Sequence, residues 1–253
     1  MRLRWLGTAG LELQSGDTTI LIDPDLTRNP QATPQQPLEP SDFMHAEAVF
    51  ITHGHFDHTH DLPAVVAASG ADVHASASVC KALIKRGMPA GKLKEMQEGE
   101  SVEIGPFKAT AIPACHVHFD TPLILATLKR CLRIFPKLVK MGPPKFPTGE
   151  VLGWLLEVEG KKLFDLGSAC MRWEPEEGID IFLVPVQGRT NICEVAADLV
   201  RKVKPETVIP HHFDDFYPPL SQTVDLKPLI DEVSRMDSDI EVSVPSINQW
   251  MEP

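Results

Sequence analysis

The sequence predicts an α/β (α+β) fold in which two β-sheets pack face to face and helices cover their outer faces. Strand-like and helix-like segments occur in both halves of the chain, which is the main observation behind this prediction. The 253 residues are 43% hydrophobic, enough for one large core or for two halves that share it. No repeat of fixed short period interrupts the pattern.

Apolar segments bounded by Gly, Ser, Asp and Pro define the elements of the first half. A long proline-containing loop over residues 24–42 is expected to line a site. Asp61, with Pro63 two residues later, is expected to cap a short helix. The expected strands are 2–7, 10–15, 18–23, 48–52, 72–75, 100–105 and 107–114, with a helix over 77–87.

The second half repeats the mixture of strands and helices after an irregular segment over 120–149. Gly160 closes an expected hairpin, and Asn191 with Glu194 forms a capping-box pattern for the helix that follows. The expected strands are 151–159, 161–167, 179–186, 206–213 and 240–244, and the expected helices are 192–204 and 224–236.

Composition excludes several classes of protein. No apolar run is long enough to span a membrane, and the first residues do not resemble a signal peptide. Five cysteines without CxxC spacing favour reduced thiols in the cytoplasm. The formal net charge of -11 disfavours nucleic acid as a partner, because phosphate contacts need clustered Lys and Arg. The oligomeric state is left open.

A histidine cluster follows the apolar strand "AVFIT". In the stretch "HGHFDHTHD", His53 and His55 would point to the same side of an extended chain and could hold one metal ion. Asp57 and His58 come at the turn and could reach a second ion. Imidazole and carboxylate ligands suit Zn, and also Mn or Fe(II).

The remaining candidate ligands end other apolar strands, as a shared cleft would require. His116 ends one of these strands and Asp165 ends another. His211 and His212 are adjacent at the end of a third strand. Neighbouring strand residues face opposite ways, so both histidines are not expected to bind one ion.

These residues make the chain resemble the metallo-β-lactamase-fold hydrolase superfamily over nearly its whole length. "HGHFDH" matches the family motif HxHxDH, and the later His, Asp and His follow in the family's order. The chain is most similar to the branch that contains ascorbate-6-phosphate lactonase. The resemblance implies a single αββα four-layer domain over residues 1–253, with a basic helical insertion at about 120–149.

The resemblance also implies a set of ligands for two divalent ions. The Pro-x-His pattern of the family selects His212 over His211 as the last ligand. Metal one would be held by His53, His55 and His116, metal two by Asp57, His58 and His212, and Asp165 would bridge them.

Two features depart from the family pattern. The family often has Asp-Thr-Gly at the bridging carboxylate, whereas this chain has Leu166 at the middle position, which removes a supporting hydroxyl. His118 lies two residues beyond His116 and is a rival ligand or a substrate contact. His60 needs no role.

Two adjacent cations lower the pKa of a bridging water to near 7 and polarise the group under attack. The residue set therefore implies hydrolysis of a phosphodiester, ester or lactone, with a small anionic substrate. Asp57 is the candidate to manage the proton of the water. Two alternatives stay open: a non-catalytic metal-binding member of the fold, and a membrane-surface phospholipid phosphodiesterase.

The segment over residues 121–149 is basic within an acidic chain. It carries six Lys or Arg residues and no acidic residue, and Thr121 and Pro122 fit the N-cap and the first position of a helix. Pro136 is expected to kink or stop that helix. Apolar residues recur at helical spacing from Ile124 to Phe135. The segment is interpreted as a cover for the core, as a lid that attracts an anionic substrate, or as a contact with a membrane surface.

Overall fold

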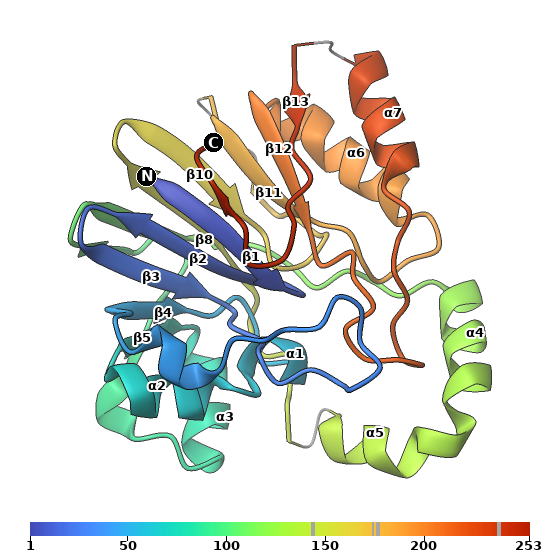
Figure 1. Cartoon of the computed structure of the whole chain (residues 1–253), viewed down its shortest axis with the longest axis horizontal. Helices are drawn as coiled ribbons and strands as arrows, with labels where there is room; N and C mark the ends of the chain where they lie inside the picture. Colours follow the sequence, from blue (N-terminus) through green and yellow to red (C-terminus); the bar gives the residue numbers. More distant parts are fainter. Residues whose placement is uncertain (143–144, 174, 176–177, 237–238) are drawn as a thin grey trace.

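A computed structural model describes residues 1–142, 145–173, 175, 178–236 and 239–253, except for the side chains at positions 137, 140 and 141. The chain forms two seven-stranded sheets that face each other, with helices on the outer side of each (Figure 1). The second sheet is built entirely from residues that follow the first six strands along the chain.

The first sheet has the strand order β14-β1-β2-β3-β4-β5-β6. β1, β2 and β3 form an antiparallel meander, and β4, β5 and β6 then add in parallel. The helical segments of this half are η1 (Pro40–Phe43), α1 (Phe56–Thr59), α2 (Leu62–Ser69), α3 (Ala77–Lys85) and η2 (Ala90–Lys92). The strands are β1 (Arg2–Gly7), β2 (Gly10–Ser15), β3 (Thr18–Ile22), β4 (Ala48–Phe50), β5 (Asp72–Ala75), β6 (Leu93–Glu95) and β14 (Trp250–Met251).

The second sheet has the order β13-β12-β11-β10-β9-β8-β7. β7 to β10 are antiparallel, and β10 to β13 run parallel. Its strands are β7 (Ser101–Ile104), β8 (Phe107–Pro113), β9 (Leu152–Val158), β10 (Lys161–Asp165), β11 (Ile181–Pro185), β12 (Thr207–His211) and β13 (Glu241–Val242). α6 (Ile192–Val203) and α7 (Lys227–Met236) are its covering helices.

Three apolar clusters fill the three interfaces between these layers. The central cluster joins the sheets, and it includes Trp5 and Leu13 from the first and Trp154 and Leu163 from the second. A second cluster packs α6 and α7 on the outer face of the second sheet. A third packs α2 and α3 on the outer face of the first. The layers are therefore helix, sheet, sheet and helix, as predicted.

The segment between β8 and β9 forms α4 (Thr121–Cys131), η3 (Leu132–Ile134) and α5 (Phe135–Met141). The N-cap of α4 is Asp120 and not Thr121 as expected, because the Asp120 carboxylate accepts a hydrogen bond from Leu123 N at 2.9 Å. The helix is interrupted just before Pro136, near the expected break. Positions 143 and 144, and the side chains of Lys137 and Lys140, lie outside the described part. α4 and α5 lie at one edge of the molecule, beyond the other helices and strands (Figure 1).

Two expected helix caps are wrong in detail. Asn191 precedes α6 but its side chain caps no backbone N–H. Asp61 precedes α2 but its carboxylate instead accepts hydrogen bonds from Leu26 N at 2.6 Å and Thr27 N at 2.7 Å. The loop that follows β3 takes the Asp61 carboxylate away from the helix, because the backbone donors of this loop need a partner in the interior.

The expectation that all five cysteines are reduced is also wrong. Cys115 and Cys170, 55 residues apart in sequence, form a disulfide. The loops after β8 and β10 lie side by side, with a single bridge between Ala114 and Met171. Cys80, Cys131 and Cys193 are free. Among the described residues, no helix is long and apolar enough to cross a membrane.

Candidate metal centre

The loop after β4 carries the histidine cluster into a turn at the edge of the two sheets. Asp57 and His58 lie in the short helix α1, whereas His53 and His55 precede it. Gly54 is required between them, because a Cβ there would lie 2.2 Å from the backbone oxygen of Pro147. The backbone of Gly54 also donates to Thr148 O at 2.8 Å. The segment that returns from α5 therefore rests directly on the cluster.

His116 and His212 reach the same place from the second sheet. His116 follows β8, and His212 follows β12 with a left-handed backbone (φ 57°). This conformation is unfavourable for a residue with a Cβ. It is held by a hydrogen bond from His212 N to Thr8 O at 2.7 Å.

Six of the predicted ligands form two groups of three. His53, His55 and His116 offer nitrogen atoms that lie within 4.8 Å of one another. Asp57, His58 and His212 form a second group by the same measure. The rings of His53 and His58 have centroids 3.8 Å apart, so the two groups adjoin.

Four of the histidines use one ring nitrogen for a hydrogen bond and leave the other for their group. This arrangement is typical of metal ligands, whose second nitrogen is commonly held by a protein partner that fixes the ring. The pairs are His53 Nδ1 with Thr52 Oγ1 at 3.1 Å, His55 Nε2 with Thr148 Oγ1 at 2.8 Å, His58 Nδ1 with Asp23 Oδ2 at 2.6 Å, and His116 Nδ1 with Val117 O at 2.8 Å.

Burial and mutual repulsion keep the first group neutral. Burial lowers the pKa of His53 well below its ordinary value and that of His55 to about 4. The pKa of His116 is also lowered, chiefly by burial, and so is that of His212 in the second group. Because metal ions bind only the unprotonated imidazole, these four side chains are ready to bind at neutral pH.

The second group contains charged side chains. Burial would raise the pKa of Asp57, but His58 and His212 outweigh it and hold the pKa far below its ordinary value. Burial would lower the pKa of His58, but the charges of Asp23 and Asp57 raise it to about 9. The group therefore contains an ionised carboxylate and an imidazole that a cation would have to deprotonate.

Asp165 ends β10 as expected and is buried. His211 Nε2 lies 3.1 Å from its Oδ1 but without the alignment of a hydrogen bond, and neither carboxylate oxygen has a hydrogen-bond partner among the described residues. Burial raises the pKa of Asp165. A buried carboxylate with free acceptors fits a cation ligand. Asp165 belongs to neither group of three, and its bridging role stays a prediction.

The residues after Asp165 explain the departure from the family pattern. Leu166 is fully buried in the apolar cluster beneath α6, so a hydroxyl there would face no polar partner in that cluster. Gly167 has φ 62°, and a Cβ on it would lie within 2.5 Å of the Thr52 side chain. Ser168 Oγ instead accepts from Val117 N at 3.0 Å, next to His116. The Ser168 hydroxyl thus supports the loop that carries His116.

Asp23 is a site residue that the sequence interpretation missed. It directly follows β3 with φ 41°, and its carboxylate accepts from Thr52 N at 2.8 Å, from the Thr52 hydroxyl and from His58. It is completely buried. An acidic residue at the end of an apolar strand is the same signal that identified Asp165, and it could have identified Asp23.

A second buried polar network lies beside Asp23. Thr8 Oγ1 donates to Asp25 Oδ2 at 3.0 Å, and Thr8 N contacts both carboxylate oxygens of Asp214 at 3.2 Å. Arg28 forms a buried ion pair with Asp214. Burial, followed by the charges of Asp61 and Asp57, raises the pKa of Asp25 well above its ordinary value.

Other histidines lie outside the two groups. His118 and His60 are exposed, and neither joins a group in the described ranges. His116 and His212 are the members of the two groups, and their role as ligands stays a prediction.

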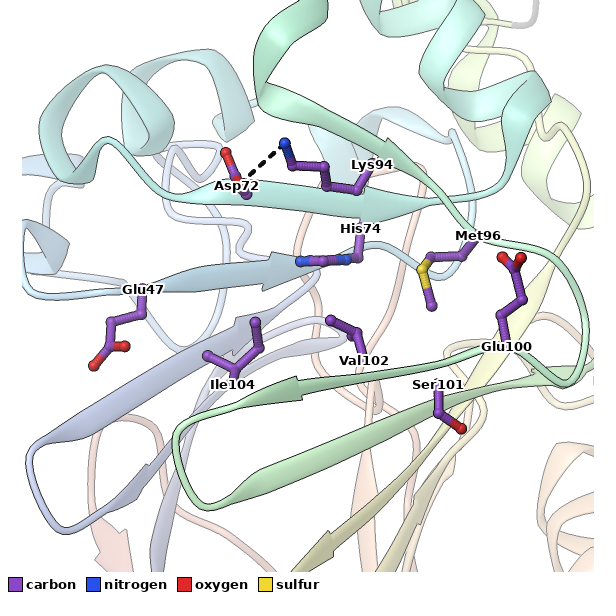
Figure 2. Close-up of a pocket in the computed structure, with 9 residues that line it drawn as sticks. All are labelled: Glu47, Asp72, His74, Lys94, Met96, Glu100, Ser101, Val102 and Ile104. Carbon is purple, nitrogen blue, oxygen red and sulfur yellow. Dashed lines mark ion pairs between the residues drawn. The ribbon is translucent and has the colours of Figure 1, made fainter.

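A separate hollow of about 520 Å³ lies between edge strands of the two sheets. Figure 2 shows Asp72 and Lys94 of the first sheet on one side and Val102 and Ile104 of β7 on the other. His74 lines it and stacks on Phe50, with ring centroids 5.0 Å apart. The hollow shares no residue with the two groups and mixes acidic, basic and apolar side chains, so it offers no comparable ligand set.

Comparison with known proteins gives consistent matches. A family model described as "Beta-lactamase superfamily domain" matches residues 18–213. A UPF0173 metal-dependent hydrolase of Pyrococcus abyssi is 25% identical over 93% of this chain and 95% of its own. Another, from Methanopyrus kandleri, is 26% identical over 96% of each chain. Among solved structures, Igni18, a metallo hydrolase from Ignicoccus hospitalis, has a TM-score of 0.68 at 18% identity, covering 100% of this chain and 98% of its own.

Proposed function

Because the chain belongs to the beta-lactamase superfamily, whose family model spans residues 18–213, we propose that it is a metal-dependent hydrolase with a dinuclear centre. The proposed ligands are the two groups of three, with Asp165 shared between the ions. Zinc is the proposed metal, because nitrogen and carboxylate donors suit it, as they also suit Mn or Fe.

One observation supports the proposal above the others. The two groups adjoin through His53 and His58, and four of their histidines have one ring nitrogen already held by a protein partner. A structural histidine also keeps a protein partner, but it does not need its second nitrogen to converge with those of two other side chains. The similarity to named metal-dependent hydrolases gives independent support.

Bound divalent ions would supply an activated water and a Lewis acid for the carbonyl or phosphoryl oxygen under attack. The chain's own groups would position the reactants. Asp57 stays ionised and can accept a hydrogen bond from the attacking water, which orients it. Thr148 and Asp23 hold the rings of His55 and His58 in place.

Charge favours an anionic substrate. The seven proposed ligands include five histidines and two carboxylates, so two divalent ions would leave a net charge of about +2 at the centre. The basic residues of α4 to α5 add to this local field. We therefore propose a small anionic phosphodiester, ester or lactone as the substrate.

Metal content and hydrolysis together test the proposal. Protein purified without chelator is expected to contain about two transition-metal ions per chain and to hydrolyse bis(p-nitrophenyl) phosphate or a simple lactone. His212→Ala should lose about one ion and most of the activity, whereas the exposed His118→Ala should keep both. Protein that binds ions fully but hydrolyses neither substrate class would favour the non-catalytic alternative.

Asp165→Asn tests the shared ligand separately. It removes a negative charge from between the proposed ions but keeps the size of the side chain. Affinity for the second ion should fall, and turnover should fall by about 100-fold or more. Wild-type turnover with full metal content would show that Asp165 is only a structural residue.

A further inference from the structure

The helical segment α4–η3–α5 exposes an apolar stripe. Six of the ten large hydrophobic side chains that are exposed in the described part of the chain lie between Ile124 and Val139. Leu132 is 72% exposed and Leu125 is 63% exposed. The six residues, named here the apolar stripe, are Ile124, Leu125, Leu128, Leu132, Phe135 and Val139.

The apolar stripe does not pack against the core of the protein. Successive residues from Leu125 to Val139 are three or four positions apart, so they share one side of a helix. The inner side is occupied by other residues: Cys131 is buried, and Arg130 donates to Pro219 O at 3.2 Å and to the Gln222 side chain. The expectation that this apolar face closes the core is therefore wrong.

Basic residues adjoin the stripe. Lys129 and Arg133 are exposed and lie one turn apart, and in the sequence Lys137 and Lys140 follow four and seven residues after Arg133. No acidic residue occurs between 121 and 149, although the whole chain has a net charge of -11. An apolar face flanked by cations is the pattern of helices that lie in the headgroup region of a bilayer.

The segment is also tied to the metal centre at both ends. Before α4, the Phe119 ring contacts His116 with centroids 5.5 Å apart, and Asp120 accepts from Thr190 N at 2.8 Å. After α5, Thr148 is hydrogen-bonded to His55. The stripe therefore belongs to a segment whose two ends contact the ligand histidines His116 and His55.

We propose that the apolar stripe with Lys129 and Arg133 is a docking surface for an anionic lipid membrane. Charge decides between the possible occupants. A second copy of the segment would bring like charges together, whereas an anionic bilayer offers both a hydrophobic interior and opposite charge. The proposal does not depend on the hydrolytic function, because docking needs neither metal nor substrate turnover.

Vesicle co-sedimentation of the full chain tests this proposal. Wild-type protein should sediment with vesicles of equal parts phosphatidylcholine and phosphatidylserine, and much less with phosphatidylcholine alone. Each cation near an anionic surface is worth about a factor of five in binding, so Lys129→Glu with Arg133→Glu should weaken binding at least about 25-fold. Leu125→Ser, Leu132→Ser and Phe135→Ser together should abolish it.

Matched variants control for charge and apolarity. Lys81→Glu with Lys85→Glu changes two exposed cations at the same spacing on α3, and Met44→Ser, Ile84→Ser and Val244→Ser remove three exposed apolar side chains elsewhere. Both control variants should bind as the wild type does. Unchanged far-ultraviolet circular dichroism and metal content would show that every variant is folded.

A fluorescent variant locates the contact. Leu132→Trp should be quenched by brominated lipid in anionic vesicles, beyond any quenching of the native tryptophans in the wild type. The proposal is overturned if wild-type protein stays in the supernatant or if the stripe variant binds as well as wild type. A dimer that the stripe variant dissociates, without vesicle binding, would overturn it in favour of self-association.

Discussion

Asp23 and Asp25 lie two residues apart after β3 and experience different surroundings. Asp23 accepts hydrogen bonds from Thr52 and is paired with His58 Nδ1 at 2.6 Å. Asp25 has one hydroxyl donor, Thr8, and burial with the charges of Asp61 and Asp57 outweighs the opposing charge of Arg28. The first carboxylate is therefore well compensated as an anion, and the second is not.

We predict that Asp23→Asn weakens metal binding at the group formed by Asp57, His58 and His212. The change removes the charge that orients the His58 ring, and loss of such a partner costs about 10- to 100-fold in affinity. Competition with a chromophoric chelator measures it. Asp25→Asn is the matched control and should bind within about threefold of wild type. Equal affinity in both variants would remove Asp23 from the site.

Asp25 gives a pH-dependent prediction for chelator-treated protein. Its pKa is raised in the folded state, so its contribution to stability is complete below about pH 4 and is lost as pH rises toward the folded pKa. The Asp25→Asn protein does not lose this stability at high pH, because asparagine does not ionise. Its melting temperature relative to wild type should increase by at least about 2 °C between pH 4 and pH 8. A difference that is constant with pH would contradict the raised pKa.

At the scale of single residues, the sequence predicted the two groups of three because their members end or follow apolar strands. Asp23 was missed although it also ends an apolar strand, because it is not part of a histidine pattern. Thr148 could not be found in this way. Its role depends on where a 29-residue segment, 121–149, returns to the body of the molecule, and no local pattern encodes that position.

At the scale of elements, the loop after β10 is constrained by the loop after β4. Gly167 has φ 62°, and the Thr52 side chain occupies the space where a Cβ would lie. Thr52 in turn contacts Asp23 and His53. The conformation of one turn therefore depends on a neighbour from the other sheet.

We predict that Gly167→Ala is much more destabilising than Gly160→Ala. Both glycines have positive φ, so each substitution costs about 1 to 2 kcal/mol in backbone strain. At Gly167 the added Cβ would also overlap the Thr52 side chain, which costs about 1 to 3 kcal/mol more. The space at Gly160 is open. Urea unfolding measures both. Equal losses would show that Thr52 moves aside freely.

Most elements were predictable because their apolar patterns are long and bounded by turn residues. β6 and β14 were missed because they have three and two residues and no clear alternation. Helical spacing also predicted the helix at Ile124 to Phe135. It could not indicate which apolar face is covered, because that depends on what the rest of the chain leaves available.

At the scale of the whole molecule, the disulfide joins the loop that carries His116 to the loop that follows Asp165. We predict that Cys115→Ser with Cys170→Ser lowers the free energy of unfolding by about 2 to 4 kcal/mol, because a loop of 55 residues is no longer closed in the unfolded chain. Urea unfolding measures the loss. Cys193→Ser, which removes a free thiol, is the control. Identical unfolding of wild type with and without reductant would contradict the prediction.

Each group of three takes two donors from the loop after β4 and one from the second sheet. His53 and His55 join His116, and Asp57 and His58 join His212. Neither sheet, with the loops that follow its strands, therefore supplies all three donors of either group. An ion held there would link the two sheets, so its removal would weaken the packing of one sheet against the other as well as the proposed hydrolysis.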